Sequence, residues 1–175
     1  MNHDAYSDTY VRKILGDVKT IAMVGASANT VRPSYFVLKY LIDKGYTVFP
    51  INPGQAGKTI AGQLVYASLA DLPEAPDMVD IFRNSEAAGP VTDDAIAAGA
   101  KVVWMQLTVR NDAAAARAET AGLRVVMDRC PKIEYGRHSG EISWIGVNSR
   151  KLSSKRPVRA SGFQHLSFGE GKSNT

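Results

Sequence analysis

The sequence predicts one α/β domain, a three-layer fold in which a doubly wound parallel β-sheet carries helices on both faces. Two observations support this fold class. Short apolar patterns typical of strands alternate along the chain with helical patterns, and each strand pattern ends in a turn of small or polar residues. A length of 175 residues with 45% hydrophobic content is enough for one packed core and short for two.

The strand predicted at residues 20–24 is the innermost one. It is an almost uninterrupted apolar run, which suits a parallel strand that is buried on both faces. A small-residue turn starts at Gly25, Pro33 occupies a position that the first turn of a helix tolerates, and Gly45 ends this helix. The segment is therefore predicted to form a strand, a turn and a covering helix.

The remaining elements repeat this alternation. Because a helix covers each right-handed crossover between parallel strands, we expect the strand order 3-2-1-4-5-6, with the switch of direction between strands 1 and 4. The predicted N-caps of three helices are Ser7 or Asp8, Ser85 and Asp112. In chain order the other predicted strands are residues 47–51, 64–66, 78–82, 101–106 and 123–127, and the other predicted helical segments are 7–16, 68–72, 87–98, 112–121 and 132–137.

Basic residues are concentrated towards the C-terminus. Residues 150–175 hold six Lys/Arg and one Asp/Glu, a net charge of +5, whereas residues 1–149 hold fifteen and sixteen, a net charge of −1. We therefore expect a near-neutral domain over residues 5–148 and a basic, flexible tail over residues 149–175. The near-neutral domain argues against nucleic-acid binding, which remains a third interpretation only through the basic tail. A homo-oligomer stays open, because the tail carries three apolar residues: Phe163, Leu166 and Phe168.

The sequence also argues against membrane, secreted and zinc-cluster proteins. No segment approaches the about 20 apolar residues that span a bilayer, and the N-terminus has no basic-then-apolar signal pattern. The single cysteine, Cys130, cannot form an internal disulfide and excludes a cysteine-based zinc cluster. We therefore expect a cytoplasmic protein with no membrane partner and no metal site.

Polar and basic residues follow several of the predicted strands. The carboxyl ends of parallel strands meet at one edge of the sheet, where ligands bind and where a helix N-terminus attracts phosphate. Gly25 and Ala26 would let such a ligand approach the backbone, although their alternative role is tight packing of strand and helix. The cations, hydroxyls and amides of this rim suit a multiply phosphorylated nucleotide: Ser27, Arg32, Asn52, Pro53, Lys58, Arg83, Ser85 and Gln106.

An NAD(P)-linked oxidoreductase is the alternative interpretation of this rim. Such a site has a G-x-G-x-x-G turn and an acidic residue about 20 positions further on, which binds the ribose 2′-hydroxyl. Here Ser27 and Thr30 stand where the other glycines belong, and the second strand ends in Asn52. No histidine lies in the predicted loops after strands 1 to 5, where a proton-transfer group would be needed. These departures argue against the alternative.

Seven short motifs occur in order along the chain: VGAS at 24–27, RPS at 32–34, VFPINP at 48–53, YASL at 66–69, VDIFR at 79–83, VWMQ at 103–106 and DRC at 128–130. Together they resemble the small stand-alone CoA-binding proteins. These proteins are similar to the N-terminal CoA-binding domain of succinyl-CoA synthetase alpha subunits and of ADP-forming acyl-CoA synthetases. The resemblance covers residues 14–137 and implies a Rossmann-like fold.

The resemblance also implies that CoA or an acyl-CoA lies across the carboxyl ends of the strands. Gly25, Ala26 and Ser27 would then offer backbone N–H groups and a hydroxyl to phosphate oxygens, with Asn52 and Pro53 beside the adenosine. The implied partner of the ribose 3′-phosphate is Lys58, as a point cation. The other residues implied are Phe82, Arg83 and Ser85 for the adenine and pyrophosphate, and Trp104 and Gln106 for the pantetheine arm.

The chain departs from the synthetases in one respect. Those enzymes carry a phosphorylatable histidine on a further domain and a nucleotide-grasp partner, and this chain has no residues left to encode either. We therefore expect a binding module without ligase chemistry of its own.

Cys130 follows the last predicted strand and is held by Pro131. This position places its thiol near the rim, where the pantetheine thiol of a bound CoA would arrive. We expect Arg129 and the start of the next helix to favour the thiolate, so that oxidation would trap a mixed disulfide between Cys130 and CoA. The alternative is a small buried hydrophobe.

Overall fold

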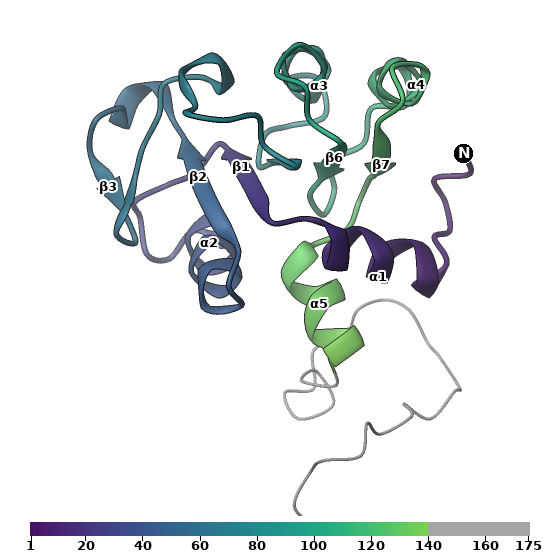
Figure 1. Cartoon of the computed structure of the whole chain (residues 1–175), viewed down its shortest axis with the longest axis horizontal. Helices are drawn as coiled ribbons and strands as arrows, with labels where there is room; N and C mark the ends of the chain where they lie inside the picture. The colour runs from purple at the N-terminus through teal and green to yellow at the C-terminus, as the bar shows by residue number, and fades with distance from the viewer. Residues whose placement is uncertain (140–175) are drawn as a thin grey trace, which may run out of the picture.

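In a computed structural model, which describes residues 1–139, five parallel strands form one sheet in the order β2-β1-β5-β6-β7 (Figure 1). The strands are β1 (Thr20–Val24), β2 (Thr47–Ile51), β5 (Met78–Ile81), β6 (Val102–Met105) and β7 (Arg124–Val126). The chain moves outward from β1 to β2 and then returns to the other side of β1 at β5, so the predicted switch of direction is confirmed. The fold is the predicted Rossmann-like, doubly wound α/β sheet.

Helices cover both faces of the sheet. One face packs against α1 (Asp8–Asp17), α2 (Pro33–Asp43) and α5 (Pro131–Ser139), and the other packs against α3 (Ala88–Ala97) and α4 (Asp112–Thr120), as Figure 1 shows. Alternate residues of each strand therefore enter two separate apolar cores. All residues of β5 and β6 are buried, as expected for strands that are covered on both faces.

The strand predicted at residues 64–66 does not join the main sheet. Instead, β3 (Thr59–Ile60) and β4 (Gln63–Leu64) form a separate antiparallel hairpin. Ala61 and Gly62, at φ of 49° and 80°, supply the two left-handed residues that a tight hairpin turn requires. Tyr66 lies at the edge of β2, where it forms an isolated parallel bridge with Ile51.

Two of the helix N-caps differ from those predicted. Ser7 caps α1 as expected, because its Oγ accepts a hydrogen bond from the Tyr10 N–H at 3.2 Å. In front of α3, however, it is Asn84 Oδ1 that accepts from the Ala87 N–H, and the N-cap of α4 is Asn111. The α4 prediction missed by one position because two cap-forming residues are adjacent in the sequence, whereas the N-cap of α3 is Ala87, which makes no side-chain cap hydrogen bond.

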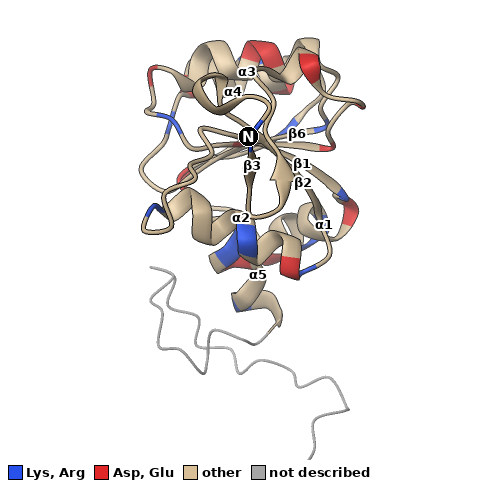
Figure 2. Cartoon of the chain, turned by 90° about the vertical axis from the view of Figure 1, so that its left-hand side faces the viewer, with Lys and Arg blue, Asp and Glu red and all other residues tan. Residues whose placement is uncertain are grey.

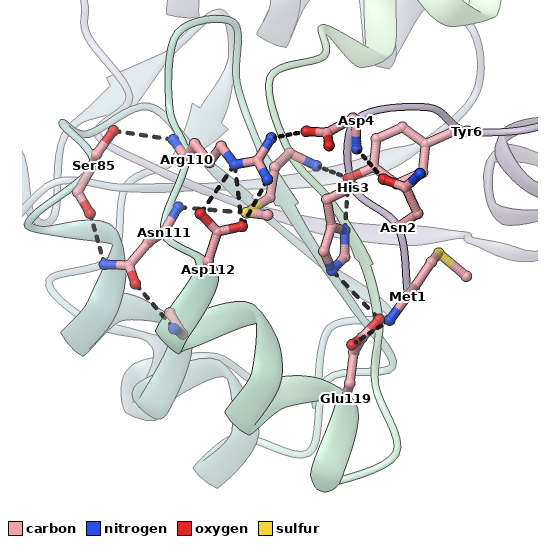
Figure 3. A network of polar contacts seen from close by, with 12 residues as sticks. Met1, Asn2, His3, Asp4, Tyr6, Ser85, Arg110, Asn111, Asp112 and Glu119 are labelled. Atoms are coloured by element: carbon pink, nitrogen blue, oxygen red, sulfur yellow. Dashed lines mark hydrogen bonds and ion pairs between the residues drawn. The ribbon is translucent and has the colours of Figure 1, made fainter.

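The N-terminal segment lies beside α4 and the edge strand β7 (Figure 3). The Met1 ammonium group contacts Glu119 at 3.0 Å, and Arg110 pairs with Asp4. Residues before position 5, the expected start of the domain, therefore contact it.

Acidic and basic residues are distributed over the helices on both faces of the sheet (Figure 2). No helix within residues 1–139 is both long and apolar enough to cross a membrane. The predicted tail at 149–175, its apolar residues and the domain boundary at 148 lie outside the described residues.

Candidate ligand-binding site

The turn after β1 is packed tightly against the ends of two neighbouring strands. Gly25 has a φ of 91°, and a Cβ at this position would lie 2.5 Å from the carbonyl oxygen of Phe82 and 3.1 Å from Cδ of Arg83. Its N–H donates to the carbonyl oxygen of Ile51 at 3.1 Å. Gly25 is therefore required by packing, and its N–H is not free for a phosphate as the resemblance had implied.

The next two residues of the turn keep their backbone donors. Within residues 1–139, no hydrogen bond uses the N–H of Ala26 or Ser27. The Ser27 hydroxyl accepts from the Asn29 N–H at 3.1 Å, which shapes the loop. Helix α2 begins at Pro33, with Arg32 at an N-cap that has no side-chain hydrogen bond. Free N–H groups, an uncapped helix N-terminus and an arginine form a surface that suits an anion.

Asn52 joins this turn to the end of β2. Its Nδ2 donates to the Ala26 carbonyl oxygen at 2.7 Å, and its Oδ1 accepts from the Gly54 N–H at 3.0 Å. Pro53 then starts a single 3-10 turn, Pro53–Gln55, and exposed Lys58 precedes the β3–β4 hairpin. The predicted residues of the second loop therefore lie along the same edge as the first turn.

A pocket with a volume of about 660 Å³ opens on the face of the sheet that α2 and α5 cover. We call it the α2–α5 pocket. Its wall is largely apolar, and Val31 and Phe36 are 75% and 52% exposed there. Arg83 and Lys132 supply positive charge. An apolar wall with a few polar groups is typical of a small-molecule site. Four predicted site residues line it: Phe82, Arg83, Gln106 and Cys130.

Trp104 and Ser85 are among the predicted site residues that do not line this pocket. Trp104 is fully buried, and its Nε1 donates to the Arg129 carbonyl oxygen at 2.8 Å, so it belongs to the core. The Ser85 hydroxyl accepts from the Arg110 N–H at 3.0 Å, and its carbonyl oxygen accepts from Asn111 (Figure 3). Ser85 thus holds the loop before α4.

A buried acid beneath the pocket was not predicted. Asp80 on β5 is completely buried, and burial raises the pKa of its carboxyl group to about 7, although the hydrogen bond from Gln106 opposes this. Gln106 Nε2 lies 2.9 and 3.1 Å from the two carboxylate oxygens. The signal in the sequence is a lone acidic residue within an otherwise apolar strand, which is rare unless the acid has a partner or a role.

Cys130 lies at the pocket as predicted, but its thiolate is not favoured. The residue is 6% exposed. Burial raises the pKa of its thiol to about 11, and this effect outweighs the opposing hydrogen bond from the Ile133 backbone; nearby Asp80 also raises it. The expected activation by Arg129 and the start of α5 is therefore wrong, because desolvation dominates.

A second cavity lies away from this site, and the described residues form no cluster that could hold a metal ion. A smaller cavity of about 380 Å³ lies at the amino ends of β1 and β2, beside Lys19 and Tyr46, away from the predicted site residues. No group of three or more His, Cys, Asp or Glu within residues 1–139 is arranged to hold a metal ion.

Comparisons with known proteins find relatives in sequence and in fold. The protein YneT of Bacillus subtilis (strain 168), described as uncharacterized, is 32% identical over 129 residues, which are 74% of this chain and 94% of that protein. A hypothetical protein from Pyrococcus horikoshii OT3 is 37% identical, with a TM-score of 0.72, over 78% of this chain and 95% of that one. Acetyl-coenzyme A synthetase 1 of Ca. Korarchaeum cryptofilum is 27% identical, with a TM-score of 0.56, over 63% of this chain but 26% of the synthetase.

The family model of the CoA binding domain matches residues 19–136, from the start of β1 to within α5. This range contains the turn after β1, the rim residues and the α2–α5 pocket. The chain therefore belongs to the CoA binding domain family.

Proposed function

We propose that this protein binds CoA or an acyl-CoA along the carboxyl ends of its strands and has no ligase chemistry of its own. The main observation behind this proposal is that the turn after β1 and the apolar α2–α5 pocket are continuous with each other. Arg83 lies against the turn after β1 and also lines the α2–α5 pocket. An anion-binding turn that runs into an apolar pocket matches a ligand with phosphates at one end and a long, weakly polar arm at the other.

The residues of the rim divide naturally between the parts of CoA. The N–H groups of Ala26 and Ser27, with Arg32 and Arg83, would bind the pyrophosphate. Lys58 would pair with the ribose 3′-phosphate, as a single cation on an exposed side chain.

The other parts of CoA fall to the remaining rim residues. Asn52 and Pro53 would border the adenosine, and Phe82 and Gln106 would contact the pantetheine arm.

The comparison with the synthetase supports a binding role for the matched region. The matched region is 26% of that chain, so the remainder of the synthetase has no counterpart in the match. The oxidoreductase alternative has no support from the comparisons. Asn52 stands where an acidic residue would bind the ribose of NAD, and its amide is used by Ala26 and Gly54.

Isothermal titration calorimetry with CoA, 3′-dephospho-CoA and NAD tests the proposal. We expect CoA to bind and NAD to show no binding. Loss of the 3′-phosphate should weaken binding by about 1.5–3 kcal/mol, the usual contribution of a charge-assisted hydrogen bond. The variant Lys58→Ala should bind CoA and 3′-dephospho-CoA equally. Binding of NAD in the absence of CoA binding would contradict the proposal, and equal affinity of wild type for CoA and its dephospho form would contradict the role of Lys58.

A further inference from the structure

A carboxyl group lies directly beneath the α2–α5 pocket. Asp80 pairs in register with Met23 on β1 and with Trp104 on β6, and all three residues are completely buried. Both of its oxygens accept from Nε2 of Gln106, at 2.9 and 3.1 Å. Gln106 itself lines the pocket. The glutamine therefore connects the buried acid to the space proposed for the ligand.

The side-chain amide of Gln106 has a donor end and an acceptor end. Nε2 is turned towards the Asp80 carboxylate, and Oε1 lies on the opposite side of the amide. Within residues 1–139, every buried side-chain oxygen has a hydrogen-bond partner. Because Oε1 has no such partner there, it is accessible from the pocket that Gln106 lines. A protonated Asp80 has an O–H to donate. Half a turn about the terminal torsion of Gln106 then lets Oε1 accept from Asp80 and turns Nε2 to the pocket within the same volume.

We propose that Asp80 and Gln106 form a proton-dependent reader of the ligand's sulfur end, with Gln106 offering an acceptor when Asp80 is ionised and a donor when Asp80 is protonated. This inference rests on the proposed function. A free CoA thiol is a hydrogen-bond donor, whereas the thioester carbonyl of an acyl-CoA is an acceptor. The pair therefore makes the choice between CoA and acyl-CoA depend on pH, with acyl-CoA preferred when Asp80 holds its proton.

The surrounding groups leave Asp80 as the switch. Burial raises its pKa to about 7, so its protonation changes near neutral pH. The Cys130 thiol faces the same space from the loop after β7, and its pKa of about 11 keeps it protonated there. The other charged or titratable residues that line the pocket are Arg83 at the end of β5, Lys132 on α5 and Tyr40 on α2. The apolar wall formed by Val31, Phe36 and Leu107 gives an acyl group a surface to contact.

Calorimetry with three ligands near pH 6 and pH 8, on either side of the Asp80 pKa of about 7, tests the inference. The ligands are CoA, acetyl-CoA and S-ethyl-CoA, a thioether that offers neither an S–H nor a carbonyl group. Each affinity is divided by that of S-ethyl-CoA, which cancels the titration of the shared phosphates. We expect the acetyl-CoA ratio to fall and the CoA ratio to rise with pH, each by about fivefold to tenfold, the effect of one hydrogen bond.

The variant Asp80→Asn removes the titration and keeps the shape of the side chain, so both ratios should become independent of pH. The control Asp94→Asn, an exposed acid on α3 at the other face, should behave as wild type. Proton uptake on binding gives a test that needs no variant. Titrations in buffers of different ionisation enthalpy should show that the protein takes up more protons on binding acetyl-CoA than on binding CoA near pH 7. Ratios that do not change with pH in wild type, or that still change in Asp80→Asn, overturn the inference while the proposed function stands. Absence of binding by all three ligands overturns the proposed function as well.

Discussion

Gly25 stands where the chain leaving β1 passes closest to the end of β5. Its left-handed φ of 91° disfavours any side chain, and an added Cβ would lie only 2.5 Å from the Phe82 carbonyl oxygen. The sequence predicts a glycine turn here, because an apolar run stops abruptly at Gly25. It does not reveal the reason, since Phe82 reaches this glycine only through the pairing of β1 with β5.

We predict that Gly25→Ala destabilises the fold by about 2 kcal/mol or more, because it combines a strained φ with a clash against backbone. Chemical denaturation measures this loss. Gly16→Ala is the matched control, since a Cβ at that helical position meets nothing within 4 Å. The control should gain up to about 1 kcal/mol. A Gly25→Ala variant that is as stable as wild type and fails only in CoA binding would instead make this glycine a ligand contact.

Whether an individual site residue is accessible or buried depends on how far the helices cover its strand. Trp104 and Gln106 are two positions apart and face the same side of the sheet. The tryptophan lies within β6 and under the helices, whereas Gln106 lies just beyond the end of the strand, at the pocket. The sequence places both residues near a carboxyl end. It cannot give the position of α5, which decides which of the two is accessible.

At the scale of elements, the exposed edge of β7 is covered by tyrosine hydroxyls from the N-terminal region. The hydroxyl of Tyr10 on α1 donates to the Val125 carbonyl oxygen and accepts from the Val125 N–H, both at 3.2 Å. The Tyr6 hydroxyl accepts from the Met127 N–H at 2.8 Å. Unpaired backbone groups on an edge strand are a template for aggregation, and these contacts satisfy three of them.

We predict that Tyr10→Phe lowers the free energy of unfolding by about 1–2 kcal/mol, because the hydroxyl is the partner of two partly buried backbone groups of Val125. Hydrogen exchange should show faster exchange at the Val125 amide, while the apolar contacts of the ring persist. Tyr35→Phe on α2 is a matched control that leaves β7 untouched. Unchanged exchange at Val125 would mean that water replaces the tyrosine hydroxyl without loss.

The elements that the sequence predicts well are the continuous apolar runs, because burial on both faces leaves no other choice for their composition. The segment at 59–66 fails for the opposite reason. Its apolar run is interrupted at Ala61 and Gly62, whose left-handed φ angles fold the segment into a hairpin. A local turn therefore overrides a weak strand pattern.

At the scale of the whole molecule, the alternation of strands and helices predicts the strand order, since right-handed crossovers leave few topologies. The α2–α5 pocket is not predictable in the same way. It exists because the last helix described returns to pack beside α2, at the opposite end of the domain sequence. The rim residues could be identified from the sequence, because each follows a predicted strand. The place of Asp80 beneath the pocket could not, because it depends on which helices cover β5.

Two acids near the ends of β5 act on the stability of the whole fold in opposite directions. Burial tends to raise the pKa of Asp77, but hydrogen bonds from Lys101 and from the N–H groups of Lys19 and Thr20 lower it to about 2. Its contribution is present above the unfolded value of 3.8 and is lost as pH falls towards 2. The pKa of Asp80 is raised from 3.8 to about 7, so its contribution is present at low pH and lost as pH rises through 7.

We therefore predict that wild type loses stability between about pH 4 and pH 8 relative to Asp80→Asn, since the variant has no carboxyl group to ionise in the core. The shift from 3.8 to about 7 corresponds to about 4 kcal/mol across this range. Urea denaturation of both proteins at a series of pH values gives the difference. The comparison removes the contribution of His138, whose pKa is lowered by burial and which therefore opposes the trend. A difference between the two proteins that stays constant across this range would mean that Asp80 is ionised in the folded state as it is in the unfolded state, because an acid that stayed neutral in the fold would make the difference change steadily as the unfolded state ionises.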